Sequence, residues 1–197
     1  MINIENIKNI IFDFDGVILD SVELKIQAFA ELFKEFPKNK VQELVKYHIQ
    51  NGGISRYHKI QYFFENILCE EISDKEILNY AKLYSQLTKE KLCNPKYIIK
   101  ETFEFIKKNQ TYYNMHIASG ADEQDLIEIC KMLDLTQYFL SIHGSPTKKE
   151  ILVKNLLINN NYKNKETILI GDSVNDYEAA LKNNIYFYGL FRLGREE

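Results

Sequence analysis

The segment IIFDFDGV, residues 10–17, joins an apolar run to two acids and a glycine. An apolar run this short, bounded by a glycine, is typical of a fully buried strand in a parallel sheet. Asp13 and Asp15 then lie at the carboxyl end of that strand, the edge where open α/β sheets bind ligands. Two carboxylates brought together repel, share a proton or hold a cation between them. The alternative is a strand end followed by an ordinary turn, because aspartate and glycine are common turn residues.

The second half of the chain alternates between strand and helix patterns. Strands are predicted at 113–118, 140–143, 167–170 and 185–188, and helices at 97–108, 122–133, 150–158 and 176–182. Alternation at this spacing predicts a parallel, doubly wound sheet. The expected fold class is therefore α/β, with a Rossmann-like core.

A long helical block follows the first strand. Asp20 and Ser21 resemble a helix start, Pro37 is expected to end that helix, and 41–92 reads as helical. Gly52-Gly53 interrupts this pattern, and Ser73 marks a further start. Because no strand is predicted here, residues 18–93 are expected to form an inserted, all-helical cap. Residues 1–17 and 94–197 are then expected to form the core.

Composition narrows the possible partners and the compartment. Of the 197 residues, 45% are hydrophobic and 27% charged, which is typical of a globular protein, and the net charge is −3. With no broad basic surface, neither nucleic acid nor an anionic membrane is expected as a partner. Three widely spaced cysteines without a C-x-x-C pair predict reduced thiols in a cytoplasmic protein. We find no secretion signal and no transmembrane stretch, and we expect a monomer or weak homodimer.

Polar residues also follow three of the later strands. Ser119 and Gly120 end one strand, where a hydroxyl and open backbone amides suit phosphate oxygens, although a plain helix cap has the same pattern. Lys148 and Lys149 open a helix, where a cation is unfavourable unless an anion is present. Asp172 follows a buried strand and a glycine. Carboxylates at adjacent strand ends suit Mg²⁺, which prefers hard oxygen ligands.

These segments resemble, in order, the four motifs of the haloacid dehalogenase superfamily of phosphatases and phosphomutases. A second acid, Asp176, follows Asp172 at the spacing of the fourth motif. The resemblance covers the whole core, and no core motif departs from the pattern. The helical insertion is similar to the smaller cap type of phosphoglycolate phosphatase and β-phosphoglucomutase relatives. The resemblance implies a magnesium-dependent phosphatase acting on a small phosphomonoester, such as a sugar phosphate, a phosphorylated short acid or an amino alcohol.

The resemblance also implies roles for the acids. Asp13 would be the nucleophile that forms an aspartyl-phosphate. Asp15 would protonate the leaving oxygen and then accept a proton from water, while its backbone carbonyl binds the metal. Asp172 would be a direct metal ligand, and Asp176 would act through water or hold Lys149. The expected metal set is Asp13, Asp15, Asp172 and Asp176.

Ser119, the Gly120 amide and Lys149 would hold the phosphate oxygens. Lys149 is favoured over Lys148 because the family's lysine tends to lie a few residues before the apolar positions of its helix. In the cap, Gly53 and Arg56 occupy the polar interruption where such caps present specificity residues. Arg56 is expected to pair with a second anionic group on the substrate, the alternative being an arginine that faces solvent.

Rival functions fit the residues less well. A receiver domain would carry its phosphoacceptor on the third strand and would need no helical insertion. A dehalogenase would lack the second acid, Asp15. A phosphomutase keeps all four motifs and stays an alternative, as does a non-catalytic module that binds a phosphorylated ligand.

Overall fold

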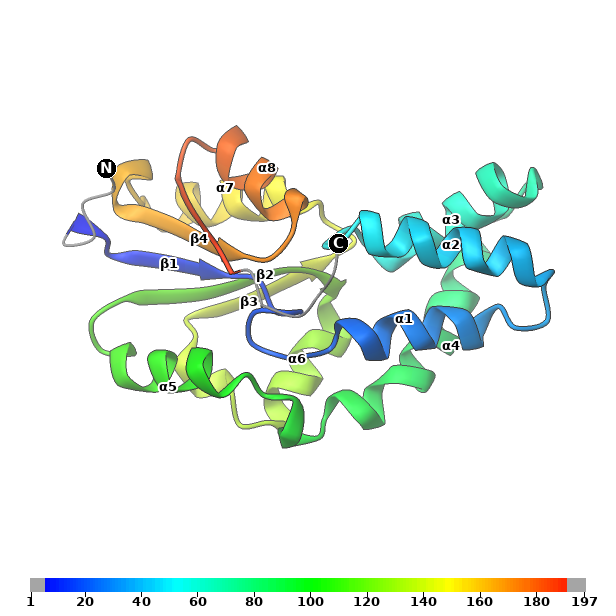
Figure 1. Ribbon diagram of the computed structural model, residues 1–197. Helices are drawn as coiled ribbons and strands as arrows, with labels where there is room; N and C mark the ends of the chain where they lie inside the picture. Colours follow the sequence, from blue (N-terminus) through cyan, green and yellow to red (C-terminus); the bar gives the residue numbers. More distant parts are fainter. Residues whose placement is uncertain (1–5, 191–197) are drawn as a thin grey trace.

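The core is a five-stranded parallel sheet with the strand order β3-β2-β1-β4-β5. The computed structural model describes residues 6–190 (Figure 1), so 1–5 and 191–197 of the predicted core lie outside the described residues. The strands are β1 (Asn9–Phe12), β2 (Asn114–Asp122), β3 (Ser141–Ser145), β4 (Thr167–Gly171) and β5 (Tyr186–Gly189). The predicted α/β fold class is confirmed.

Helices cover both faces of the sheet and form a separate group after β1 (Figure 1). The α-helices are α1 (Val22–Leu32), α2 (Lys38–Gln50), α3 (Arg56–Tyr62), α4 (Asp74–Leu92), α5 (Lys100–Asn109), α6 (Glu123–Met132), α7 (Lys149–Asn159) and α8 (Val174–Lys182). A π-helix (Phe63–Leu68) continues α3, and short 3₁₀ segments lie at Pro95–Tyr97, Thr136–Tyr138 and Asn164–Glu166.

The period of two along β1 divides the core between the two sheet faces. Ile10 and Phe12 belong to the cluster that includes residues of α5 and α6. Ile11 lies on the other face and clusters with Ala118, Leu169 and the apolar residues of α7 and α8. All four residues of β1 are buried, as expected for the central strand of a sheet covered on both faces. The ends of β1, β2 and β4 therefore have rigid support.

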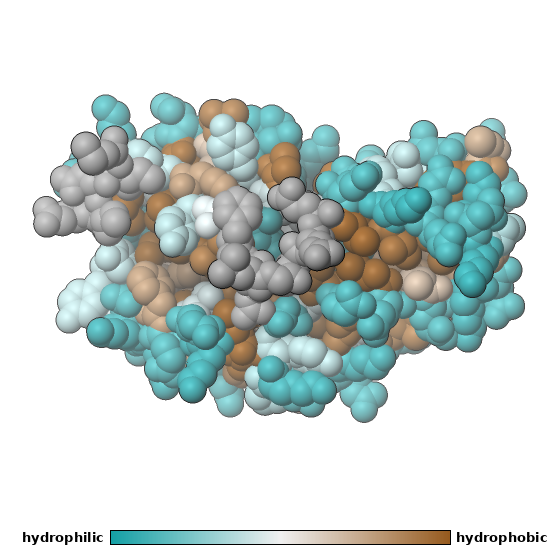
Figure 2. Space-filling model, in the orientation of Figure 1, coloured by the Kyte–Doolittle hydropathy of each residue, from teal (hydrophilic) through white to brown (hydrophobic). Residues whose placement is uncertain are grey.

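Helices α1 to α4 have a hydrophobic core of their own. Its buried residues include Ala28, Phe29 and Phe33 of α1, Val41 and Leu44 of α2, Ile60 of α3, and Ile77, Ala81 and Tyr84 of α4. Hydrophobic side chains are visible between α1 and α2 on the cap (Figure 2). A segment with its own core packs as a unit, and this unit stands beside the carboxyl ends of the strands (Figure 1). We refer to it as the cap.

Of three local predictions in the cap, two need correction. Helix α1 ends at Leu32, and Pro37 is instead the residue that precedes α2, because the fixed φ of proline suits a helix start as well as a helix end. The block 41–92 is not continuously helical after Gly53, since Cys69 adopts φ 60° and ends the π-helix. The start signal at Ser73 is correct, because Ser73 and Glu76 form a capping box.

Two further observations concern the whole described chain. Within residues 6–190, no helix is both long and apolar enough to cross a bilayer. The three cysteines are free thiols, of which Cys130 is buried, Cys93 is partly buried and Cys69 is exposed.

Candidate active site

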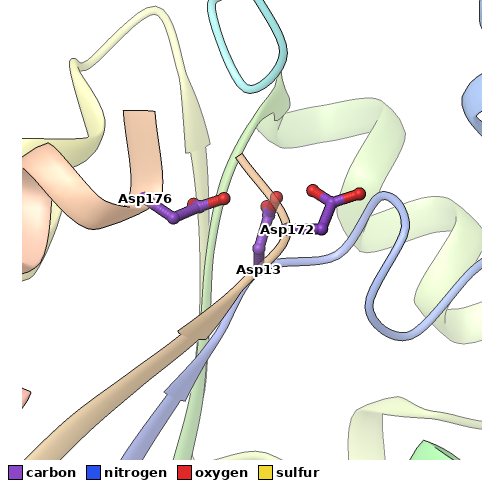
Figure 3. Close-up of side chains that lie close together, drawn as sticks. All are labelled: Asp13, Asp172 and Asp176. Carbon is purple, nitrogen blue, oxygen red and sulfur yellow. The ribbon is translucent and has the colours of Figure 1, made fainter. Parts of the chain in front are cut away.

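Three carboxylates meet at the carboxyl ends of the central strands. Asp13 follows β1, Asp172 follows β4, and Asp176 lies in the first turn of α8 (Figure 3). One oxygen from each lies within 4.8 Å of the other two. Asp13 and Asp176 are buried, whereas Asp172 is partly exposed. Burial and, after it, the Asp176 carboxylate raise the pKa of Asp13 to about 8, although Lys149 lowers it. The cluster therefore carries more negative charge than its surroundings neutralise.

Gly16 lets Asp172 approach the first strand. Gly16 has φ +78°, and a Cβ added to it would lie 1.9 Å from Asp172 Oδ2. Any side chain here would both strain the backbone and displace the carboxylate. Gly16 therefore permits both the backbone conformation of the turn after β1 and the position of the Asp172 carboxylate.

Lys149 is the cation that joins two of these acids. Its side chain is fully buried, and Nζ lies 2.8 Å from Asp13 Oδ1 and in contact with Asp176 Oδ1. Burial lowers the pKa of Lys149, but the Asp13 and Asp176 carboxylates outweigh this and raise it. Lys148 is exposed. The structure thus brings Lys149, and not its neighbour, to the end of β1.

Asp176 has two sets of partners. Its Oδ2 accepts hydrogen bonds from the Ser173 amide at 3.0 Å and the Ser173 hydroxyl at 2.6 Å, completing a capping box at the start of α8. Its Oδ1 faces Lys149. Asp176 therefore caps α8 and makes the expected contact with Lys149 at the same time.

Asp15 is held apart from the cluster of three carboxylates. Its Oδ1 accepts a 2.5 Å hydrogen bond from Ser21 Oγ, and its Oδ2 lies 2.5 Å from Lys25 Nζ. Burial favours the neutral acid, but Lys25 and Ser21 together lower the pKa of Asp15. Ser21 precedes α1 as expected, yet its side chain makes no cap hydrogen bond, because its hydroxyl is directed to Asp15 and the Leu19 carbonyl.

The lysine at position 25 gives a first testable prediction. Lys25→Met removes the cation beside Asp15, so the pKa of Asp15 is expected to rise toward or above its ordinary value. If ionised Asp15 accepts a proton during turnover, the acid limb of the pH–rate profile shifts to higher pH. The shift is measured from the dependence of kcat on pH between about pH 4 and pH 8, a range that begins near the ordinary pKa of a carboxyl group and extends past neutrality. An unmoved acid limb contradicts the assignment of Asp15 as the base.

Two of the expected phosphate-binding residues, Ser119 and Gly120, lie on β2, the strand that pairs with β1. Ser119 is buried, and its hydroxyl oxygen accepts a 3.2 Å hydrogen bond from the Ala121 amide. A Cβ added to Gly120 would lie 2.0 Å from the Gly53 carbonyl oxygen. The strand continues through Asp122 rather than ending near Ser119, and its pairing with β3 shifts register between Ala118 and Asp122. This irregular segment is where the cap approaches the core.

A cavity of about 660 Å³ separates the cap from this edge of the sheet. Acidic residues line its core side and basic residues its cap side. The acids are Asp13, Asp15 and Asp172, and the bases are Lys25, Arg56 and Lys59. Of the predicted residues, Gly53 and Gly120 also line the cavity, whereas Ser119, Lys149 and Asp176 are buried next to it.

Arg56 connects the cap to the core. Its Nη1 donates 2.7 Å hydrogen bonds to Asp125 Oδ2 of α6 and to Ser85 Oγ of α4. The guanidinium also lies 4.9 Å from the centre of the Tyr84 ring. Arg56 is buried and not solvent-facing, which excludes that alternative. Its expected contact with the substrate stays a prediction, because its charge is already paired.

Two more contacts connect the cap to the core. Tyr57 donates a 2.5 Å hydrogen bond to Asp122, and Asn175 donates one of 2.9 Å to the Gly53 carbonyl. Burial and the Asp122 carboxylate raise the pKa of Tyr57 to about 12, so this phenol stays a donor. The cap is therefore closed over the cavity by contacts to the starts of α6 and α8.

Sequence reasoning missed the partners that the cap contributes. Lys25 lies one helical turn after Ser21, and Lys59 lies one turn after Arg56 and one before Phe63. In both cases the sequence carried one usable signal, a lysine at helical spacing on a helix face that is otherwise buried.

The chemistry of the donor set fits a divalent cation. Three carboxylate oxygens at mutual distances within 4.8 Å could hold a metal ion, and Mg²⁺ prefers a few hard oxygen ligands of this kind while retaining water. Asp15 is expected to bind the metal through its backbone carbonyl, and its carboxylate contacts Ser21 and Lys25. The metal contact of its backbone carbonyl stays a prediction.

Thermal unfolding gives a metal-binding test that is independent of activity. Mg²⁺ is expected to stabilise the protein by about 2.7 kcal/mol at a concentration one hundred times its dissociation constant. Asp172→Asn removes a charged ligand and should abolish most of this shift. Asp134→Asn, an exposed residue with φ 55°, is the matched control, because asparagine tolerates that backbone conformation. An equal Mg²⁺ shift in both variants would remove Asp172 from the metal site.

Comparisons with known proteins agree with this fold. Residues 10–190 match the haloacid dehalogenase-like hydrolase family. A phosphoglycolate phosphatase from Vibrio parahaemolyticus is 26% identical over 195 residues, covering 94% of this chain and 84% of the relative. The structure of a β-phosphoglucomutase from Clostridium difficile has a TM-score of 0.72 at 18% identity, covering 94% and 85% of the two chains.

A hydrolase of the same family from Bacillus subtilis, solved bound to magnesium, has a TM-score of 0.64 at 16% identity, covering 92% and 87% of the two chains. At these identities the two structural similarities describe the fold alone. The family match spans most of the chain, and the protein is therefore a member of the haloacid dehalogenase-like hydrolase family. By homology it is a hydrolase of the phosphatase type.

Proposed function

We propose that the protein is a magnesium-dependent phosphatase that hydrolyses a small phosphomonoester through an aspartyl-phosphate on Asp13. One observation carries this proposal: Asp13 lies at the edge of a cap-covered cavity, in contact with Lys149 and beside two further carboxylates. A carboxylate nucleophile, a cation and a metal-type donor set are the parts that phosphoryl transfer requires.

The hydrogen bonds of Asp13 favour one of its oxygens for attack. The Phe14 amide and Lys149 both contact Oδ1, at 2.7 and 2.8 Å. Within residues 6–190, Oδ2 accepts no hydrogen bond. The two contacts orient the carboxylate, and Oδ2 is the oxygen that would form the bond to phosphorus while the leaving oxygen departs.

The remaining residues would stabilise charge and move protons. Mg²⁺, held by Asp13, Asp172 and, directly or through water, Asp176, would neutralise phosphate charge. Lys149 and the Gly120 amide would contact phosphate oxygens as their charge shifts, with the Ser119 hydroxyl as a further donor. Asp15 would accept the proton of the hydrolytic water, a role that matches its lowered pKa. Protonation of the leaving oxygen by Asp15 would require its pairing with Lys25 to weaken.

The size of the cavity limits the substrate. About 660 Å³ between the cap and the core suits a small metabolite rather than a protein side chain presented on a folded surface. Phosphoglycolate, the compound in the name of the Vibrio relative, is small enough to fit in this cavity. We propose that the substrate is a phosphorylated sugar, short acid or amino alcohol.

We also propose the domain boundaries: the core consists of residues 1–17 and 94–197, and the cap consists of residues 18–93.

Phosphate release from a panel of small phosphate monoesters tests the proposed activity. The panel is measured with and without Mg²⁺, and p-nitrophenyl phosphate is included as a substrate that makes few cap contacts. Turnover that depends on Mg²⁺ and favours one or two compounds is expected. Absence of turnover across the panel would contradict the phosphatase activity, and bound phosphate without turnover would instead indicate a binding module.

A further inference from the structure

Lys59 is a buried cation without an anionic partner. Within residues 6–190, three lysine or arginine side chains are buried: Arg56, Lys59 and Lys149. Arg56 is paired with Asp125, and Lys149 with two carboxylates. Lys59 is 2% exposed and forms no ion pair in the described part of the chain. Of these three buried basic side chains, Lys59 is therefore the one whose charge is not paired with a carboxylate.

The immediate partner of Lys59 is a neutral imidazole. Lys59 Nζ lies 2.9 Å from His48 Nδ1. Burial, together with the nearby charges of Lys59 and Lys25, lowers the pKa of His48 to about 3. The ring is uncharged at neutral pH, so its Nδ1 accepts a hydrogen bond from Lys59 and supplies no negative charge. Burial and the positive charge of Lys25 lower the pKa of Lys59 to about 7, although the Asp15 carboxylate raises it.

An uncompensated buried ammonium destabilises the folded protein. Lys59 contributes to the wall of the cavity that also contains Asp13 and Asp15. The other two cations of the cap side are neutralised, Lys25 by Asp15 and Arg56 by Asp125. Lys59 is thus the position on this wall where an incoming anion would gain most, because it would meet a desolvated cation that forms no ion pair with a carboxylate of residues 6–190.

We propose that Lys59 binds a second anionic group of the substrate, a carboxylate or a second phosphate, while the scissile phosphate lies at Asp13. This inference rests on the proposed phosphatase function and narrows it to short phosphomonoesters with two anionic ends. The position of Lys59 in the same cavity as Asp13 allows one small molecule to contact both. His48 holds the ammonium in place by its hydrogen bond. The specificity residue of this cap is then Lys59 rather than Arg56.

Two matched pairs of substrates test the proposal. Phosphoglycolate is compared with hydroxyethyl phosphate, and propanediol bisphosphate with hydroxypropyl phosphate, so that each pair differs in the second anionic group. The quantity measured is the ratio of kcat/KM within each pair. The wild-type ratio is expected to favour one or both anionic members, and the pair with the larger ratio identifies the anion as carboxylate or phosphate.

Lys59→Met is the test variant, and Lys46→Met is the control, because Lys46 is an exposed lysine of the cap. Lys59→Met should reduce the favoured ratio by about ten- to a hundredfold, the usual effect of losing a hydrogen bond to a charged group. Lys46→Met should keep the wild-type ratio. Equal ratios in the wild type and Lys59→Met would overturn the proposal, as would a wild type without preference in either pair.

Stability and overall activity separate the other outcomes. Lys59→Met replaces an unpaired buried charge by an apolar chain, so its melting temperature should equal or exceed that of the wild type. A lower melting temperature, with the same loss of activity on all four substrates, would make Lys59 a structural residue and overturn the proposal. If the wild type turns over none of the four and also fails with p-nitrophenyl phosphate, the proposed function itself fails, and the proposal fails with it.

Discussion

Asp13→Asn is expected to lower kcat at least about 10⁴-fold, the scale of losses found when a nucleophile is removed. The amide is a poor nucleophile, yet it keeps the shape of the carboxylate. Its oxygen can still accept from the Phe14 amide and from Lys149, which contact Asp13 Oδ1. The loss should therefore come from chemistry and not from misfolding. It is measured by Mg²⁺-dependent phosphate release.

Stability supplies the control for this variant. Asp13 is buried beside Asp176, and its raised pKa shows that its negative charge is unfavourable there in the absence of a cation. Asp13→Asn is thus expected to unfold at the same temperature as the wild type or at a higher one in metal-free buffer. Asp134→Asn, the exposed control, should keep full activity. Substantial turnover by a well-folded Asp13→Asn protein would remove Asp13 from the role of nucleophile.

Lys149→Met is expected to reduce both activity and stability. It leaves Asp13 and Asp176 buried without the cation that joins them. Removing one partner of a buried ion pair costs about 3–5 kcal/mol of unfolding free energy. Losing a charged group that stabilises the transition state lowers kcat on the order of 10²–10³-fold. Chemical denaturation and phosphate release measure the two effects on the same sample.

The adjacent lysine is a control from the same loop. Lys148 is exposed and its side chain makes no cap hydrogen bond at the start of α7. Lys148→Met should change the unfolding free energy by no more than about 0.5 kcal/mol and leave turnover unchanged. Equal effects of the two substitutions would contradict the account of the site, because only Lys149 reaches Asp13.

The positions of the core residues follow from local sequence. Asp13 and Asp172 each come directly after an apolar strand, and parallel strands bring such ends to one edge of the sheet. The start of α7 places Lys149 next to that edge. The position of each of these residues follows from the strand or helix next to it, and that strand or helix can be predicted from the neighbouring sequence.

The cap contacts depend instead on how distant helices pack. Lys25 reaches Asp15 because α1 leaves the core at a particular angle, and Arg56 meets Asp125 across a sequence separation of 69 residues. The spacing within α1 or α3 can indicate that a charged side chain lies on a buried face, but it does not predict which residue of another element that side chain contacts. Ser21 shows the same limit, because its position before α1 was predictable but the direction of its hydroxyl toward Asp15 was not. Because Arg56 is already paired with Asp125, Lys59 is the buried cation of the cap that forms no ion pair within residues 6–190.

Trapping the covalent intermediate tests the central claim most directly. The protein is mixed with its best phosphomonoester and Mg²⁺, quenched in acid during turnover, and reduced with borohydride, which converts an aspartyl-phosphate to homoserine. The account predicts homoserine at position 13 in the wild type, formed and consumed at a rate that matches phosphate release, and none in Asp13→Asn. Phosphate release without modification at position 13, or modification at another carboxylate, would contradict it.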